Sequence, residues 1–188
     1  MCESARRVTA PLSKSAIGGL TAGDRVLLSG IVYTARDAAH ARMIEAIGAG
    51  GALPFDIRGQ AIFYAGPTPA PAGAPVGSIG PTTSARMDAF TPRLLELGLA
   101  GMIGKGLRSR EVIDAIKRHG AVYFASIGGA AALTARRVKS CEVVAYGDLG
   151  PESIKRLHVE DMPLIVAIDA NGNNFYEIGP AAYRLQIS

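Results

Sequence analysis

The fold is decided by the stretch Ser84–Ser126, which reads SARMDAFTPRLLELGLAGMIGKGLRSREVIDAIKRHGAVYFAS. Apolar residues recur at helical spacing over 84–97 and 109–118, and each of these segments is followed by a short apolar run, at 99–103 and 121–126. This alternation of helices and strands predicts a layered α/β fold with a mostly parallel central sheet. In such folds, ligands collect beyond the carboxyl ends of the strands, where the helices begin.

The same alternation extends to both sides of this stretch. The 188 residues are expected to form one domain, 1–188, in which residues 1–22 are an N-terminal arm with a short edge strand and a helical turn. The other expected elements are strand 25–34, helix 36–47, strand 60–65, helix 129–138, strand 141–146, helix 151–158, strand 163–169, a turn at 171–173 and a short strand at 175–178.

Composition narrows the functional class. The net charge of +4 is modest, and its cations are interleaved with acids and lack an aromatic platform, so we expect no nucleic-acid partner. Cys2 and Cys141 form no disulfide framework, which favours a reducing, cytoplasmic location. The chain start lacks the apolar run of a signal peptide, and the apolar run 162–168 is too short to span a bilayer. We therefore expect a soluble protein without a membrane partner.

The segment Gly80–Asp88, GPTTSARMD, predicts an anion site. Thr83 or Ser84 is expected to cap the following helix, whose first N–H groups and dipole, together with Arg86, suit a carboxylate or phosphate. An ordinary basic helix start is the alternative. The Pro- and Gly-rich loop 66–81 is expected to deliver this segment to a site, although a proline-motif ligand is the alternative.

Three cations stand at predicted junctions between strands and helices: Arg36, Arg86 and Lys105. Together they predict a pocket for a small polyanion such as a dicarboxylate, because arginine forks bind carboxylates in a bidentate manner. Solvated charge is the alternative, and it is the interpretation for the other basic residues of this region, Arg108, Arg110, Arg136, Arg137 and Lys139.

Other motifs of catalysis are missing or weak. There is no P-loop, no dinucleotide-binding glycine motif and no nucleophile elbow, and the three histidines (His40, His119 and His158) have no paired ligand spacing. We interpret the histidines as surface residues or as residues whose ring nitrogens are fully hydrogen-bonded, and not as metal ligands. Candidate acid–base groups are Asp37, Asp88, Asp148 and Glu152, although acids near helix starts also complement the helix dipole.

Several phrases resemble one protein family. SGIVYTARDAAH (29–40), GPTTSARMD (80–88) and MIGKG (102–106) resemble the β subunit of iron–sulfur hydro-lyases, and so do SIGGAAA (126–132), DLGPE (148–152) and PLIVAID (163–169). The family comprises the class I fumarate hydratases and the L-tartrate dehydratases. The resemblance runs in order from about residue 7 to residue 184, and it does not choose between the two substrates.

The resemblance implies a swivelling β/β/α domain that takes part in the reversible hydration of fumarate to (S)-malate on a [4Fe–4S] cluster. In the family, three cysteines of an α region bind this cluster and leave one iron open to act as a Lewis acid. Because this chain has only two distant cysteines, the cluster is expected on a separate α subunit, in an α2β2 assembly.

The family's substrate-holding residues match Arg36, Thr82, Arg86 and Lys105, and Thr83 is a further substrate-binding candidate. Thr82 is the candidate for proton transfer. A threonine hydroxyl is a weak base, so Thr82 acts in this way only if nearby cations lower its pKa, and otherwise it holds substrate. The competing functions are an L-tartrate dehydratase β subunit and a non-catalytic dicarboxylate-binding or regulatory module.

Overall fold

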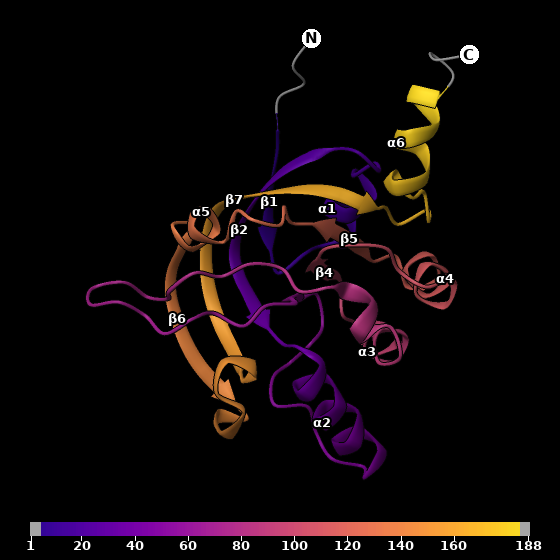
Figure 1. The fold of residues 1–188 in the computed structure, drawn as a ribbon. Helices are drawn as coiled ribbons and strands as arrows, with labels where there is room; N and C mark the ends of the chain where they lie inside the picture. Colours follow the sequence, from indigo (N-terminus) through magenta and orange to yellow (C-terminus); the bar gives the residue numbers. More distant parts are fainter. Residues whose placement is uncertain (1–4, 185–188) are drawn as a thin grey trace.

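A computed structural model describes residues 5–184, in which seven strands form one mixed sheet (Figure 1). The strands are β1 (Arg6–Ala10), β2 (Arg25–Thr34), β3 (Ala61–Phe63), β4 (Gly101–Gly104), β5 (Val122–Ala125), β6 (Val138–Ala145) and β7 (Ile154–Ile168). The helices are α1 (Lys14–Gly18), α2 (Asp37–Gly48), α3 (Thr91–Glu96), α4 (Arg110–His119), α5 (Ala131–Ala135) and α6 (Phe175–Arg184), with 3₁₀ turns at Ser84–Met87 and Gly147–Glu152.

The sheet closes on itself through its longest strand. Strands β1 to β5 are parallel neighbours in chain order, whereas β7 runs antiparallel to all of its partners. One edge of β7 pairs with the whole of β2, and its other edge pairs first with β6 and then with β5. Since β2 also pairs with β3, the strands β2, β3, β4, β5 and β7 form a closed ring.

Two apolar cores lie on the two faces of these strands. On β3, Phe63 belongs to the core enclosed by the ring and Ile62 to the core under the helices; on β5, Phe124 and Tyr123 alternate in the same way. Figure 1 shows α2, α3 and α4 together on one side of the sheet, where their apolar faces cover the second core. Within residues 5–184, no helix has both the length and the apolar character needed to cross a membrane.

Several sequence predictions are confirmed. The strand at 25–34 has the predicted bounds, and the helices predicted at 36–47 and 109–118 are α2 and α4. Ser109 caps α4, because its hydroxyl accepts the N–H of Val112. The expected edge strand and helical turn of residues 5–20 are β1 and α1. The long loop 66–81 contains no helix or strand.

The predicted helix 84–97 is wrong, because it divides into a 3₁₀ turn and the short helix α3. Pro92 occupies the first turn of α3, a position that suits a residue without an N–H group and that is unsuited to a helix interior. The helix therefore restarts at Thr91. The predicted helix 129–138 is likewise shorter, since it ends at Ala135 and β6 begins at Val138.

Two predictions near the carboxyl end are also wrong. Residues 151–158 form no α-helix: 151–152 end the 3₁₀ turn Gly147–Glu152, and from Ile154 the chain is the first half of β7, in which buried Leu157 and Val159 alternate with more exposed neighbours. Residues 175–178 form no strand but begin α6, because the Asn174 side chain accepts the N–H of Tyr176 at the helix start.

Candidate functional site

The predicted cations lie at one edge of the sheet. Arg36 follows β2 and Lys105 follows β4, and the loop after β3 returns between them. There the Thr82 N–H donates to the Tyr64 carbonyl at 2.7 Å, and the Ser84 N–H donates to the Lys105 carbonyl at 2.9 Å. Because β2, β3 and β4 are parallel neighbours, their carboxyl ends meet at this edge. The long loop therefore does return to the strand ends, as its sequence predicts.

Arg36 and Arg86 form a cluster with two carboxylates, those of Asp37 and Glu152, and Lys105 is its third cation. Arg36 Nη2 lies 3.0 Å from Glu152 Oε1, and Arg86 Nη2 lies 2.6 Å from Asp37 Oδ2. Arg36 Nε lies 3.9 Å from Asp37 Oδ1, which is too far for a hydrogen bond. Both of these last two atoms are buried, and neither has a hydrogen-bond partner within residues 5–184. The two atoms form an ion pair with each other, and the N–H of Arg36 Nε is left without a hydrogen-bond acceptor within residues 5–184.

Lys105 is the free cation of the cluster. Its side chain is exposed, and it makes no hydrogen bond or ion pair in the described part of the chain. It extends along Gly128, where an added Cβ would lie 3.8 Å from Lys105 Cδ and 4.0 Å from Nζ. Gly128 follows β5, so the ammonium group lies at the same strand edge as the arginines. Three cations face only two carboxylates, and this excess of positive charge favours an anionic ligand.

The α-helix predicted to begin within residues 80–88 is not present there. Ser84–Met87 is a single 3₁₀ turn, and the Thr83 side chain makes no capping hydrogen bond. The predicted cradle of helical N–H groups is therefore missing here, and the attraction for anions comes from side chains. Within residues 5–184, neither the half-buried Thr82 nor the exposed Thr83 uses its hydroxyl in a hydrogen bond. Both hydroxyls are therefore available to a ligand.

Ser84 supports the cluster from inside the protein. It is buried, and the Tyr123 hydroxyl lies 2.9 Å from both Ser84 Oγ and the Gly106 carbonyl. Burial raises the pKa of the Tyr123 phenol far above its ordinary value, so this group stays protonated and donates. A Cβ at Gly104 would overlap Ser84 Oγ, so only glycine lets residues 82–84 approach β4 this closely.

Arg108 is buried, so its interpretation as solvated charge is wrong. Its side chain is 0% exposed, with Nε 2.7 Å from Asp88 Oδ1 and Nη2 donating to Thr91 Oγ1 at 2.8 Å. The guanidinium lies over the rings of Tyr64 and Tyr123, at 5.3 and 5.0 Å from their centroids. Asp88, a candidate acid, is thereby held in a structural ion pair. No local pattern reveals this burial, because every partner comes from another element.

The remaining candidate acids fall into two groups. Asp37 and Glu152 belong to the cluster, as described above. Asp148 lies outside it and pairs with Arg42, whose Nη1 donates to Asp148 Oδ1 at 2.8 Å. The Arg42 guanidinium holds the pKa of the Asp148 carboxyl below its usual value. Asp37 and Glu152 are therefore the two acids placed to influence a ligand.

His40 is fully buried beside the cluster, and its interpretation as a surface or fully hydrogen-bonded residue is wrong. Its Nδ1 lies 2.8 Å from the Arg36 carbonyl, which can only accept, so Nδ1 carries the proton. Its Nε2 is buried and has no partner among the described residues. Burial lowers the pKa of His40 to about 4, so the imidazole is neutral at pH 7.

The donor set of this chain does not fit an iron–sulfur cluster. Within residues 5–184, no group of three or more His, Cys, Asp or Glu side chains is placed to hold a metal ion. Cys141 is half-buried, and burial raises the pKa of its thiol, whereas a cluster needs thiolates. Cys2, the other cysteine of the sequence, lies outside the described residues.

Curated proteins with known names share much of this sequence. The chain is 45% identical over 155 residues to "Fumarate hydratase class I, anaerobic" of Escherichia coli K12, and this match covers 81% of the chain and 28% of the relative. It is 42% identical over 155 residues to "Fumarate hydratase 1, mitochondrial" of Leishmania major, with 81% and 28% covered. The chain thus spans little more than a quarter of the length of these fumarate hydratases.

A third relative has a similar length to this chain. It is a protein of Methanocaldococcus jannaschii, provisionally named L(+)-tartrate dehydratase subunit beta, which is 41% identical over 172 residues, with 88% of both chains covered. The family model described as "Fumarase C-terminus" matches residues 3–179, which include every residue of the cluster. The chain therefore belongs to the Fumarase C-terminus family.

Proposed function

We propose that this chain is the β, substrate-binding subunit of a two-subunit iron–sulfur hydro-lyase that hydrates fumarate reversibly to (S)-malate. The observation that carries the proposal is the convergence of Arg36, Arg86 and Lys105 at one sheet edge, where, within residues 5–184, Arg36 Nε has no hydrogen-bond partner and Lys105 has no ion pair. Small dicarboxylates carry two anionic groups, which such a set of cations can hold at both ends.

In this proposal the cations do more than bind. Loss of the C3 proton from malate places negative charge on the adjacent carboxylate, and a cation already in position stabilises that charge without reorganisation. Lys105 suits this role because no acid of the described chain neutralises it. Arg36 and Arg86 orient the substrate, since their guanidinium groups are themselves held by Glu152 and Asp37.

Thr82 and Thr83 complete the proposed site. The Thr82 N–H is hydrogen-bonded to the Tyr64 carbonyl, and this bond fixes the backbone from which the Thr82 hydroxyl extends beside the cations. We assign Thr82 either proton transfer at C3 or a hydrogen bond to a substrate carboxylate, and Thr83 the second of these roles. Nearby positive charge favours the alkoxide that proton transfer by threonine requires.

The rest of the enzyme is assigned to a partner. The [4Fe–4S] cluster belongs, in this proposal, to an α subunit in an α2β2 assembly, because the donor set of this chain does not suit it. The name of the M. jannaschii relative, which specifies a subunit beta, supports a separate α chain. Residues 1–188 then act in the cytoplasm as one swivelling β/β/α domain, with residues 1–22 as its arm. The same relative keeps L-tartrate as the second candidate substrate.

The test is an anaerobic assay of this chain alone and with its candidate cluster-bearing partner. Arg86→Ala is compared with Arg93→Ala, since both side chains are 47% exposed and both pair with one carboxylate at 2.6 Å. We expect activity only in the mixture, a loss of about 10²–10³-fold in Arg86→Ala and a change within about twofold in Arg93→Ala. If the mixture converts L-tartrate but not fumarate, the substrate assigned to the enzyme changes to L-tartrate. If the partner carries its iron–sulfur cluster and the mixture converts neither substrate, the proposal is overturned in favour of a non-catalytic binding module.

A further inference from the structure

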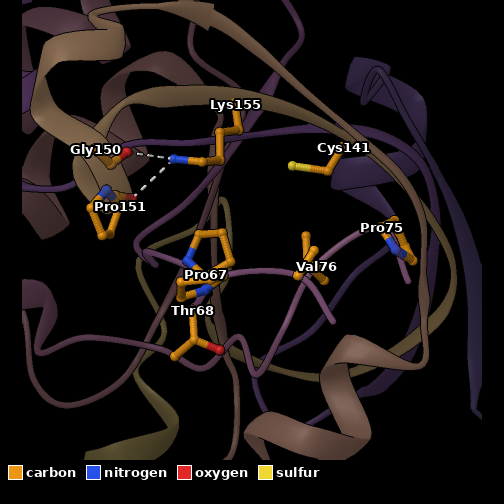
Figure 2. Close-up of a pocket in the computed structure, with 10 residues that line it drawn as sticks. Pro67, Thr68, Pro75, Val76, Cys141, Gly150, Pro151 and Lys155 are labelled. Atoms are coloured by element: carbon orange, nitrogen blue, oxygen red, sulfur yellow. Dashed lines mark hydrogen bonds between the residues drawn. The ribbon is translucent and has the colours of Figure 1, made fainter. Parts of the chain in front are cut away.

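Lys155 is a buried cation close to the site. It projects from β7 into a cavity of about 300 Å³ between the proline-rich loop and the turn Gly150–Ser153, and Cys141, from the neighbouring strand β6, lines the same side of this cavity (Figure 2). Lys155 is only 8% exposed, and burial lowers the pKa of its ammonium group. A cation in such a place destabilises the fold unless its protons are all used in hydrogen bonds.

All three ammonium protons have acceptors in the turn Gly150–Ser153. Lys155 Nζ donates to the Gly150 carbonyl at 2.8 Å, to the Pro151 carbonyl at 3.2 Å and to Ser153 Oγ at 2.5 Å. The first two of these bonds are drawn in Figure 2. With no proton left over, Lys155 is not a receptor for a ligand in the cavity. Its interactions are directed entirely at the shape of the turn.

The turn needs this support. Gly150 has φ 56° and ψ −118°, a conformation that residues with a side chain rarely adopt. The carbonyl groups of Gly150 and Pro151 also converge on one point, where their negative ends repel each other unless a cation lies between them. The Lys155 ammonium occupies that point.

The turn is also in direct contact with Arg36. Glu152, within the turn, lies 3.0 Å from Arg36 Nη2. A Cβ added to Gly66 would lie 2.8 Å from the Pro151 carbonyl oxygen and 3.5 Å from Arg36 Cδ, so the turn, Gly66 and Arg36 pack against one another. A shift of the turn would therefore move both the carboxylate and the backbone that hold this arginine.

We propose that Lys155 is a positioning residue, which sets the orientation of the Arg36 guanidinium through the turn Gly150–Ser153. The inference rests on the proposed function, because it makes Lys155 control how Arg36 meets a substrate carboxylate. Lys155 itself does not touch the substrate. Arg36 holds a carboxylate both before and during the reaction, so disturbing it weakens binding more than it slows the chemical step.

The test compares Lys155→Met with Arg156→Met in the assembled enzyme. Arg156 is the adjacent residue on β7, is exposed and lies 3.9 Å from its partner Glu142, so its variant makes the same change in charge. In Lys155→Met we expect faster hydrogen exchange at the Ser153 amide, which donates to the Gly150 carbonyl. We also expect KM for fumarate to rise about tenfold while kcat stays within about threefold. Arg156→Met is expected to leave the hydrogen exchange of the Ser153 amide, KM and kcat unchanged.

A double variant separates positioning from simple damage. In a Glu152→Gln background, Lys155→Met is expected to raise KM by less than it does alone, because both changes act on Arg36 through the same turn. A fall in kcat with unchanged KM would mean loss of folded enzyme and would overturn the inference, as would additive effects on KM. If Lys155→Met does not fold, Ser153→Ala removes one of the three acceptors and should give smaller changes in the same direction.

The inference and the proposed function fail in different ways. An active wild type whose KM is unchanged in Lys155→Met and Ser153→Ala overturns the inference alone. A wild-type assembly that is silent on both fumarate and L-tartrate overturns the proposed function, and the role assigned to Lys155 with it.

Discussion

Replacing Arg108 with methionine should destabilise the protein strongly, even though the sequence predicts that this arginine is solvated. Methionine keeps much of the side-chain length and can still pack on Met102, whose sulfur lies 3.7 Å from Arg108 Nη1. It removes the ion pair to Asp88 and the contacts with the rings of Tyr64 and Tyr123. The Asp88 side chain, only 13% exposed, then keeps its charge without an ion-pair partner.

The magnitude follows from that unpaired charge. Removing one partner of a buried ion pair costs about 3–5 kcal/mol in the free energy of unfolding, whereas a surface pair contributes about 0–1 kcal/mol. Arg110→Met is the matched control, because Arg110 is two residues away with a side chain that is 82% exposed. We expect the control to stay within about 0.5 kcal/mol of wild type.

The assay is urea unfolding at pH 7 of wild type, both single variants and the double variant Arg108→Met/Asp88→Asn. The double variant removes the stranded charge, yet the asparagine oxygen can still accept the Ser109 N–H that Asp88 Oδ2 accepts at 2.6 Å. We expect it to recover about 1–3 kcal/mol of the loss. A loss below about 1 kcal/mol in Arg108→Met, or no recovery in the double variant, would refute the reasoning.

Three further predictions concern groups near the site. His40 has a pKa of about 4 in the folded protein, against an ordinary value of 6.5. The unfolded chain therefore takes up the proton at a higher pH, and the free energy of unfolding falls as the pH drops from about 6.5 to 4. Between pH 7 and pH 4, chemical unfolding of the wild type should show a loss in the free energy of unfolding about 3 kcal/mol larger than in His40→Gln. Gly104→Ala should cost about 1–3 kcal/mol, because its Cβ would overlap Ser84 Oγ and lie 2.9 Å from a carbon of the Tyr64 ring; adding Ser84→Ala should restore part of this in the same assay, and equal stabilities of the two variants would contradict the overlap. In a Cys2→Ser background, Cys141 should react with iodoacetamide more slowly than free cysteine at pH 7.5, because burial raises its thiol pKa; an equal rate would show that the thiol is not protected.

The candidate site was largely predictable because its signals are local. A strand, a glycine or small-residue turn and a cation follow one another around Arg36 and Lys105, and parallel strands must bring their carboxyl ends to one edge. The loop before Arg86 also carries its own turn residues. The ion pairs within the cluster could not be predicted from local sequence. Glu152 lies far from Arg36 in the chain and meets it only because β7 pairs antiparallel with β2.

The sequence by itself determined the order of the elements up to β6 and the residues that present charge at the strand ends. These features follow from hydrophobic period, proline and glycine positions and capping residues, each of which acts within a few residues. Tertiary structure alone decided that β7 closes the ring and that His40, Arg108 and Lys155 are buried. It also decided that, among the described residues, Arg36 Nε has no hydrogen-bond partner and Lys105 has no ion pair. The physical reason is that the cost of burying a charge, and the choice of its partner, depend on segments that are distant in the chain.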